Sequence, residues 1–201
     1  MKIGLFFGSF NPVHNGHLII AEHVLNFTDL REVWFVVSPQ NPFKNSNTLL
    51  NENHRINLVR TAIEGEDRLK ASNVEFKLPK PSYTVNTLAY LKEKYPLHEF
   101  AIIMGSDGFQ NLHQWKNAQI IIDNYPIYIY MRPGFDINRN GPAKIHTLEA
   151  PLLQISSTHL RYLIAEGKSI RYLVPDTVRE EIEKNGYYSS SLENPSKKKT
   201  T

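Results

Sequence analysis

The sequence Ile-Gly-Leu-Phe-Phe at residues 3–7 is followed by Gly8-Ser9-Phe10-Asn11-Pro12-Val13-His14-Asn15-Gly16-His17 and then by an apolar segment at 18–25. The first segment predicts a buried strand, and the last has apolar residues at helical spacing. Two glycines and a proline in the loop between them allow its backbone to approach a ligand closely. A loop that ends at a helix start presents unpaired N–H groups and the positive end of a dipole, which favour phosphate. The stretch therefore predicts a strand, a phosphate-binding loop and a helix.

The rest of the chain continues this alternation of apolar runs and helical patterns. Strands are predicted at 32–37, 74–76, 99–104, 127–131 and 145–148, and helices at 52–63, 85–93, 117–122, 157–165 and 175–184. This order predicts an α/β fold, a Rossmann-like doubly wound parallel sheet with helices on both faces. Ligands bind such sheets beyond the carboxyl ends of the strands, which here means just after Phe7, Val37, Met104 and Met131.

Length and charge suit a single domain with a short tail. We predict one domain at residues 1–188 and a flexible Ser- and Lys-rich tail at 189–201. The net charge is +3, and the tail carries Lys197, Lys198, Lys199 and Glu193, so the remainder is nearly neutral. Because the basic excess is not spread over a folded face, we do not expect nucleic acid binding.

Composition excludes several other classes of protein. There are no cysteines, which excludes disulfides, thiolate metal sites and a cysteine nucleophile. No apolar run is long enough to span a bilayer, so no membrane association is expected. The first residues lack the long apolar region of a signal peptide, and a cytoplasmic location is expected. The sequence does not predict an oligomeric state.

His14 and His17 are the first candidates for catalysis. If the helix begins near Asn15, both imidazoles lie on its first turn and face the same side. Two N–H donors there suit stabilisation of a phosphorus centre that gains negative charge. Two alternatives remain: His14 caps the helix while His17 packs in the core, or both bind zinc, for which no third ligand is evident nearby.

A second candidate anion site lies at Ile155-Ser156-Ser157-Thr158-His159-Leu160-Arg161. Its hydroxyls open a predicted helix, and Arg161 follows one turn later on the same side. N–H groups and hydroxyls suit phosphate oxygens, and a guanidinium fork suits their charge. The alternative is an ordinary Ser N-cap with a solvated arginine.

Together these motifs resemble the nucleotidyltransferase superfamily, whose signature ends in (His/Thr)-x-Gly-His, and most of all the bacterial nicotinate-nucleotide adenylyltransferases. Their loop commonly reads Gly-Ser-Phe-Asp-Pro-(Ile/Val)-His-Asn-Gly-His, so Asn11 stands where Asp is usual. Residues 155–161 are similar to the family's Ile-Ser-x-Thr-x-x-Arg motif, which grips the β- and γ-phosphates of ATP. Lys44 follows a proline-rich loop, as in the family's Pro-x-x-Lys, although Phe43 replaces the usual His. The resemblance runs from Lys2 to about Tyr188.

The resemblance assigns residues to three roles. It implies His14, His17 and Lys44 as catalytic residues, with a solvated lysine as the alternative for Lys44. It implies an ATP site of Gly8, Ser9, Phe10, Gly16, Gly105, Asp107, Ile155, Ser156, Ser157, Thr158 and Arg161. For the second substrate it implies Ser82, Tyr83, Thr84, Trp115 and Arg132. Asp107 has an alternative role as a helix cap, Trp115 as a core residue and Arg132 as a solvated cation.

The implied reaction is attack by the 5′-phosphate of nicotinate mononucleotide on the α-phosphorus of ATP. That phosphate is largely dianionic near neutral pH, because its second pKa is about 6, so no general base is needed. Mg²⁺ is expected to arrive with ATP, held mainly by phosphates and water, with no protein metal site. Three alternatives remain: nicotinamide mononucleotide or phosphopantetheine as acceptor, an aminoacyl-tRNA synthetase core, which would need a Lys-Met-Ser-Lys-Ser loop that is absent, or a non-catalytic ATP-binding module.

Overall fold

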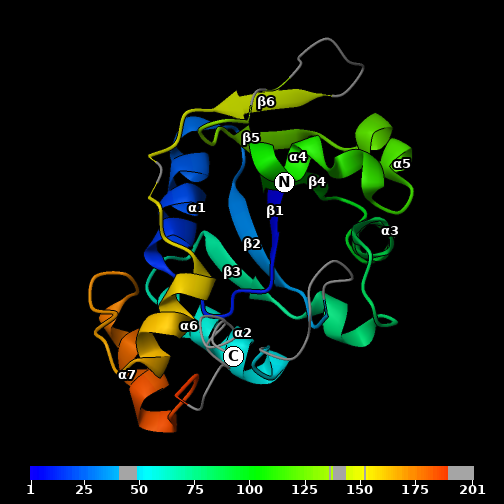
Figure 1. Cartoon of the computed structure of the whole chain (residues 1–201). Coiled ribbons are helices and arrows are strands. Elements are labelled where there is room, and N and C mark those ends of the chain that lie inside the picture. Colours follow the sequence, from blue (N-terminus) through cyan, green and yellow to red (C-terminus); the bar gives the residue numbers. More distant parts are fainter. Residues whose placement is uncertain (41–48, 136, 138–143, 152, 190–201) are drawn as a thin grey trace, which may run out of the picture.

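A computed structural model describes residues 1–40, 49–135, 137, 144–151 and 153–189 of the chain (Figure 1). Six parallel strands form one sheet in the order β3-β2-β1-β4-β5-β6. They are β1 (Lys2–Gly8), β2 (Glu32–Val37), β3 (Leu69–Ser72), β4 (Glu99–Gly105), β5 (Ile127–Tyr130) and β6 (Ile145–Leu148). The chain winds outward from β1 to β3 and then returns to β4 on the other side of β1. The predicted doubly wound fold is confirmed, and its switch point lies between β1 and β4.

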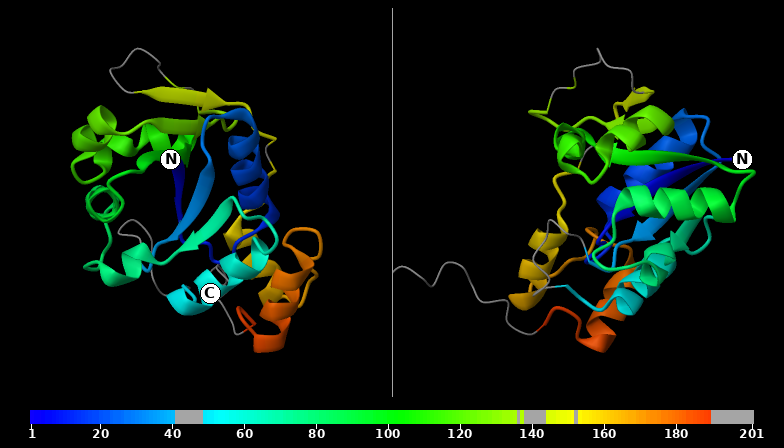
Figure 2. Two further views of the ribbon diagram at one scale, coloured as in Figure 1. Left: turned by 180° about the vertical axis from the view of Figure 1, so that it is seen from behind. Right: turned by 90° about the vertical axis from the view of Figure 1, so that its right-hand side faces the viewer.

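Helices cover both faces of this sheet. The α-helices are α1 (Asn15–Phe27), α2 (Glu52–Ala62), α3 (Thr84–Lys94), α4 (Ser106–Gln110), α5 (Ala118–Asn124), α6 (Ser157–Ala165) and α7 (Asp176–Asn185). Figures 1 and 2 show α1, α6 and α7 on one side of the sheet and α3, α4 and α5 on the other. Short 3₁₀ turns occur at η1 (Val74–Lys77) and η2 (Leu112–Gln114).

The alternation of side chains along the strands produces two cores. On β1, Phe6 faces the cluster formed with α1, α2, α6 and α7, while Ile3 and Leu5 face the cluster formed with α3 and α5. Ile3 and Leu5 are fully buried, as expected for a strand covered on both faces. The central strands are therefore held rigidly, and their carboxyl ends can position loops.

The strand predicted at residues 74–76 is wrong. Val74–Lys77 forms the 3₁₀ turn η1, and the strand β3 precedes it at Leu69–Ser72. The physical reason is Glu75, which is 1% exposed and accepts hydrogen bonds from buried hydroxyls. An extended segment would alternate its side chains across the sheet, whereas the tight turn directs this carboxylate inward.

The last described residues pack against the domain. The hydroxyl of Tyr188 donates to Asn11 Oδ1 at 2.9 Å, and burial raises the pKa of that phenol. Residues 190–201 of the predicted tail lie outside the described residues, so the tail stays a prediction. Among the described residues, no helix combines the length and apolar character required to cross a bilayer.

Candidate active site

A cleft of about 490 Å³ opens at the carboxyl edge of the sheet, between the starts of α1 and α6. Its lining comprises Phe6, Phe7, Gly8, Ser9, Phe10, Asn11, His14, His17, Gln40, Leu49, Tyr130, Arg132, Ile155, Ser156, Ser157, Thr158 and Arg161. The two motifs that the sequence places about 140 residues apart therefore border one space. Both predicted anion sites face it, which follows from the position of the switch point.

The start of α1 brings the two histidines into contact. The helix begins at Asn15, as predicted, and His14 is its N-cap residue. The imidazole rings of His14 and His17 stack with centroids 3.6 Å apart and planes 22° apart. Both rings therefore face the same side of the first turn.

Burial keeps His14 neutral. The side chain is 6% exposed, and this burial, reinforced by the nearby cation of Arg132, lowers the pKa of His14 to about 4. Its Nδ1 atom is buried and has no hydrogen-bond partner among the described residues. Near neutral pH the ring therefore carries one N–H, which acts as a hydrogen-bond donor without adding a full charge.

The proton of His17 is positioned by the backbone. The Nδ1 atom of His17 accepts a hydrogen bond from the backbone N–H of His14 at 3.2 Å. A neutral imidazole that accepts at Nδ1 carries its proton on Nε2. His17 lines the cleft, so this tautomer supplies an N–H donor to an anion bound there.

Two glycines make room for aromatic rings around this helix start. A Cβ atom at Gly16 would lie 3.1 Å from His14 Nδ1, and one at Gly8 would lie 2.8 Å from the Phe10 ring. Phe10 adopts a left-handed φ of 44° and is 2% exposed, packed edge-on against Phe6 and His17. Such a backbone conformation is costly for a bulky residue and is kept where surrounding packing enforces it. Gly16 lies beneath His14 and does not line the cleft.

The start of α6 is a second helix N-terminus with a hydroxyl cap. Ser156 Oγ accepts from the backbone N–H of His159 at 3.2 Å. Ser157 Oγ donates to the carbonyl of Pro12 at 2.8 Å, and Arg161 Nη1 donates to the carbonyl of Asn11 at 2.8 Å. These two bonds fasten α6 to the first loop, so Ser157 and Arg161 also hold the two anion sites together.

Arg161 lines the cleft together with Thr158. Its Nη2 lies 3.4 Å from Thr158 Oγ1, and its buried Nε has no partner among the described residues. Burial lowers the pKa of this guanidinium, which remains a cation at any physiological pH. The start of α6 therefore offers hydroxyls, helix N–H groups and a permanent charge.

Arg132 joins the cleft from the end of β5. Its Nη1 pairs with Asp107 Oδ2 at 3.2 Å, its Nη2 contacts the Tyr130 hydroxyl at 3.2 Å, and its backbone N–H donates to Ser106 Oγ at 2.9 Å. A Cβ at Gly105 would lie 2.3 Å from Asp107 Oδ1, so a larger residue there would displace the Asp107 side chain that pairs with Arg132. Gly105 and Asp107 do not line the cleft themselves. Asp107 contacts Arg132, which does.

Of the residues predicted for the second substrate, Arg132 lines this cleft, whereas Ser82, Tyr83, Thr84 and Trp115 lie outside its lining. Thr84 begins α3 and Tyr83 is its N-cap residue, while the Lys116 ammonium lies 4.4 Å from the centre of the Tyr83 ring. Trp115, next to Lys116, is half-buried and packs against the second core. Ser82 donates its hydroxyl to Glu75 at 2.6 Å, which directs it into the protein.

The predicted site and the lining of the cleft differ at several residues. Lys44 lies outside the described residues, and its role stays a prediction. Gln40, Leu49 and Tyr130 line the cleft and were not predicted. The rule that ligands bind beyond strand ends could have found Tyr130, which ends β5.

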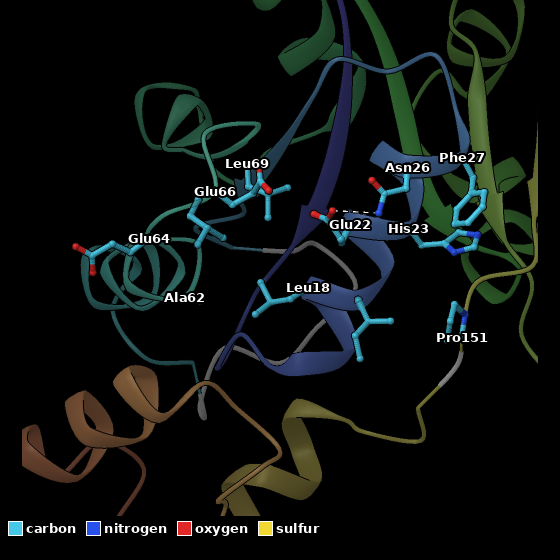
Figure 3. A pocket seen from close by; sticks show the side chains of 12 residues that line it. Leu18, Glu22, His23, Asn26, Phe27, Ala62, Glu64, Glu66, Leu69 and Pro151 are labelled. Carbon is cyan, nitrogen blue, oxygen red and sulfur yellow. Dashed lines mark hydrogen bonds between the residues drawn. The ribbon is translucent and has the colours of Figure 1, made fainter.

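A second hollow of about 470 Å³ lies between α1 and α2 (Figure 3). Its polar lining includes the carboxylates of Glu22, Glu64 and Glu66, and Arg68 pairs with two of these at 3.0 Å. Carboxylates are acceptors and repel phosphate oxygens. A nucleotide therefore suits the first cleft and not this hollow.

The sequence is similar to one family of known proteins along nearly its whole length. The family described as Cytidylyltransferase-like matches residues 5–163. A protein of Cytophaga hutchinsonii named probable nicotinate-nucleotide adenylyltransferase is 50% identical over 191 residues, covering 94% of this chain and 100% of its own. One of the same name from Flavobacterium johnsoniae is 49% identical over 191 residues, covering 94% of this chain and 99% of its own.

Solved structures share the fold. The Plasmodium falciparum nicotinic acid mononucleotide adenylyltransferase complexed with NaAD has a TM-score of 0.80 and 23% identity, covering 96% of this chain and 99% of its own. A putative nicotinate-nucleotide adenylyltransferase from Vibrio parahaemolyticus has a TM-score of 0.71 and 23% identity, covering 95% and 97%. With two helix starts facing one cleft and near-complete matches at about half identity, the chain belongs to the nicotinate-nucleotide adenylyltransferase family of nucleotidyltransferases.

Proposed function

We propose that the cleft between α1 and α6 is where this chain transfers the adenylyl group of ATP to nicotinate mononucleotide, giving nicotinate adenine dinucleotide and pyrophosphate. A phosphate oxygen of the mononucleotide forms a bond to the α-phosphorus, and the bond from that phosphorus to the bridging oxygen of pyrophosphate breaks. The observation that carries the proposal is that the donors of His14, His17 and Arg161 face one space. Phosphoryl transfer of this kind requires alignment of two anions and stabilisation of charge more than covalent chemistry.

Each side of the cleft has a separate task. His17, with its proton on Nε2, donates to an oxygen of the α-phosphate as negative charge grows there, and His14 assists from the stacked position. Ser156, Thr158 and Arg161 bind the β- and γ-phosphates, which leave as pyrophosphate. Lys44 is assigned to the triphosphate on the family resemblance alone.

The acceptor side is assigned to the start of α3. Its N-terminal N–H groups favour the carboxylate of nicotinate over a neutral amide. Tyr83 and Thr84 begin this helix, and Trp115 supplies a flat aromatic surface nearby. We therefore propose that the acid form of the mononucleotide is preferred.

Mg²⁺ is proposed to enter with ATP. The donors that line the cleft include hydroxyls, imidazoles and the guanidinium groups of Arg132 and Arg161, which suit phosphate oxygens, and Asp107 is engaged by Arg132. The metal would therefore be held as a complex with the triphosphate and water, and when bound it would supply positive charge to the phosphates. Because ATP and pyridine mononucleotides are cytoplasmic metabolites, we propose a cytoplasmic location.

The test is pyrophosphate release from ATP and Mg²⁺ with nicotinate mononucleotide or with its amide counterpart. Preference for the acid by tenfold or more in kcat/KM supports the proposal, with the dinucleotide product identified by mass. Equal use of both acceptors would overturn the assigned acid preference but not adenylyl transfer. Binding of ATP without pyrophosphate release from either acceptor would favour a non-catalytic module.

A further inference from the structure

Two charged side chains are buried behind the cleft, and neither belongs to the proposed catalytic set. Arg55 on α2 is 0% exposed, and Glu75 in η1 is 1% exposed. Burying a charge is costly unless it is hydrogen-bonded, so such residues are retained where their bonds hold something in place. Burial lowers the pKa of the Arg55 guanidinium, which still carries its charge.

Arg55 donates hydrogen bonds to backbone carbonyls next to the proposed triphosphate site. Its Nη1 donates to the carbonyls of Ser9 at 2.6 Å and Ser38 at 2.8 Å. Its Nη2 donates to the carbonyl of Pro39 at 3.1 Å, and its Nε donates to the carbonyl of Leu50 at 2.7 Å. One rigid, planar group therefore fixes the phosphate-binding loop after β1 against the segment that follows β2.

Glu75 accepts hydrogen bonds from side-chain hydroxyls near the start of α3, next to the proposed mononucleotide site. Its Oε2 accepts from Ser82 at 2.6 Å and from Ser38 at 2.8 Å, and its Oε1 accepts from Thr87 at 2.9 Å. Ser82 and Thr87 flank the start of α3, the helix end assigned to the nicotinate carboxylate. A carboxylate, which only accepts, matches three hydroxyl donors.

Ser38 connects these two groups. Its carbonyl accepts from Arg55 and its hydroxyl donates to Glu75, so bonds run from Ser9 to Ser82 through three side chains. We propose that Arg55, Ser38 and Glu75 form a positioning relay that sets the distance between the two substrate sites. Arg55 positions the triphosphate loop, and Glu75 positions the start of α3. Neither is a catalytic residue, and the inference rests on the proposed function.

The relay matters because reaction between two bound anions depends on their alignment. A displacement of about 1 Å between reacting groups can lower the rate a hundredfold. The two substrate sites lie on opposite faces of the sheet, so packing within either core alone does not fix their separation. The hydrogen bonds of Arg55, Ser38 and Glu75, just beyond the carboxyl end of β2, supply that constraint.

Three variants separate this role from simple stability. Arg55→Lys keeps the charge but loses the planar fork. Because the loop assigned to the triphosphate is then held less firmly and the two anions lose alignment, this variant is expected to raise KM for ATP and to lower kcat by about tenfold to a hundredfold, with less than twofold change in KM for nicotinate mononucleotide. Glu75→Gln, which turns one acceptor into a donor, is expected to show the reverse pattern. Ser38→Ala keeps the carbonyl that accepts from Arg55 and removes only the hydroxyl bond to Glu75, so it should follow Glu75→Gln and raise KM for nicotinate mononucleotide more than KM for ATP.

Arg60→Gln is the control on the same helix, since Arg60 is exposed and, among the described residues, its side chain donates to Asn57 within α2. It should change neither KM. Amide hydrogen exchange on the protein alone gives a second readout: Arg55→Lys should accelerate exchange at residues 8–10, and Glu75→Gln at residues 82–87.

Equal loss for both substrates, or uniformly faster exchange over the whole sheet, would overturn the relay and leave a structural role. If the wild-type chain does not use nicotinate mononucleotide, the proposed function fails. The exchange pattern then decides the relay by itself, because it needs no substrate.

Discussion

The starts of α1 and α6 both offer hydrogen-bond donors to an anion in the cleft, but the donors differ in charge. At α1 the donors are imidazoles, His14 being buried and neutral, whereas at α6 they are hydroxyls and the permanent cation of Arg161. A neutral donor attracts an anion weakly in the ground state and gains most as charge develops, while a fixed cation binds a charged group throughout. We therefore expect α1 to govern turnover and α6 to govern ATP binding.

The largest effect is expected from His17→Ala. Removing the Nε2–H donor is expected to lower kcat by about a hundredfold to a thousandfold, the usual loss of a donor to a transition-state oxyanion. The dissociation constant of ATP, measured by calorimetry, should change less than threefold. Equal losses in both quantities would instead make His17 a ground-state binding residue.

The control for that variant lies on the same helix. His23 packs on Phe27 and lines the hollow of Figure 3, away from the cleft. His23→Ala should therefore leave both kcat and the ATP affinity near wild type.

The neutrality of His14 can be tested through the pH dependence of stability. Its pKa is lowered from 6.5 to about 4, so the unfolded chain binds the extra proton first as pH falls. The free energy of unfolding should therefore be unaffected above about pH 6.5 and should decline by roughly 3 kcal/mol in total down to about pH 4. Urea unfolding at a series of pH values measures it.

Comparison with His14→Gln isolates this contribution from carboxylates that titrate in the same range. The difference in unfolding free energy between the two proteins should shift as pH falls from 6.5 to 4. Parallel curves would mean that the imidazole has the same pKa in the folded and the unfolded protein, and would contradict its neutrality through burial.

On the α6 side, Arg161→Met should weaken ATP more than it slows turnover. Losing a charged hydrogen-bond donor costs about 1.5–3 kcal/mol, so kcat/KM for ATP is expected to fall by roughly ten- to a hundredfold. KM should take most of the change, which steady-state kinetics measures directly. A fall confined to kcat would place Arg161 with the histidines. Arg171→Met, at an exposed arginine stacked on Tyr172, is the control.

The smallest effect is expected at Asn11, where the family usually has Asp. Asn11 Oδ1 accepts from the Leu50 N–H at 3.2 Å and from the Tyr188 hydroxyl at 2.9 Å. A carboxylate oxygen can also accept both bonds, and Asp is the usual residue in the family, so Asn11→Asp is expected to change kcat/KM by less than about threefold. A larger change would show that the charge at this position tunes the neighbouring Arg161.

The sequence predicted the elements that depend on local signals. β2, β6 and α6 begin and end at the predicted residues, because β-branched runs and a Ser cap mark them. β3 was missed, since Leu69–Ser72 is an edge strand with little β-branched content that relies on pairing with β2. The helix α4 (Ser106–Gln110) is too short for periodicity to reveal.

The buried charges were the other failure, and one of them left a usable signal. Charged residues are expected outside, yet Arg55 lies three and four residues before Leu58 and Val59, on the apolar stripe of α2. That position could have marked Arg55 as buried. Glu75, between two apolar residues, instead gave the appearance of a strand. Its turn depends on hydroxyls distant in the sequence.

The bonds that close the cleft join the two ends of the chain. Ser157 to Pro12, Arg161 to Asn11 and Tyr188 to Asn11 span 145, 150 and 177 residues. Contacts of such sequence separation form late in folding, and synthesis proceeds from the N-terminus. During most of translation the growing polypeptide therefore contains the loop with His14 and His17 but not yet Arg161, which lines the other side of the cleft. The capacity to consume ATP arises only once nearly the whole domain has left the ribosome.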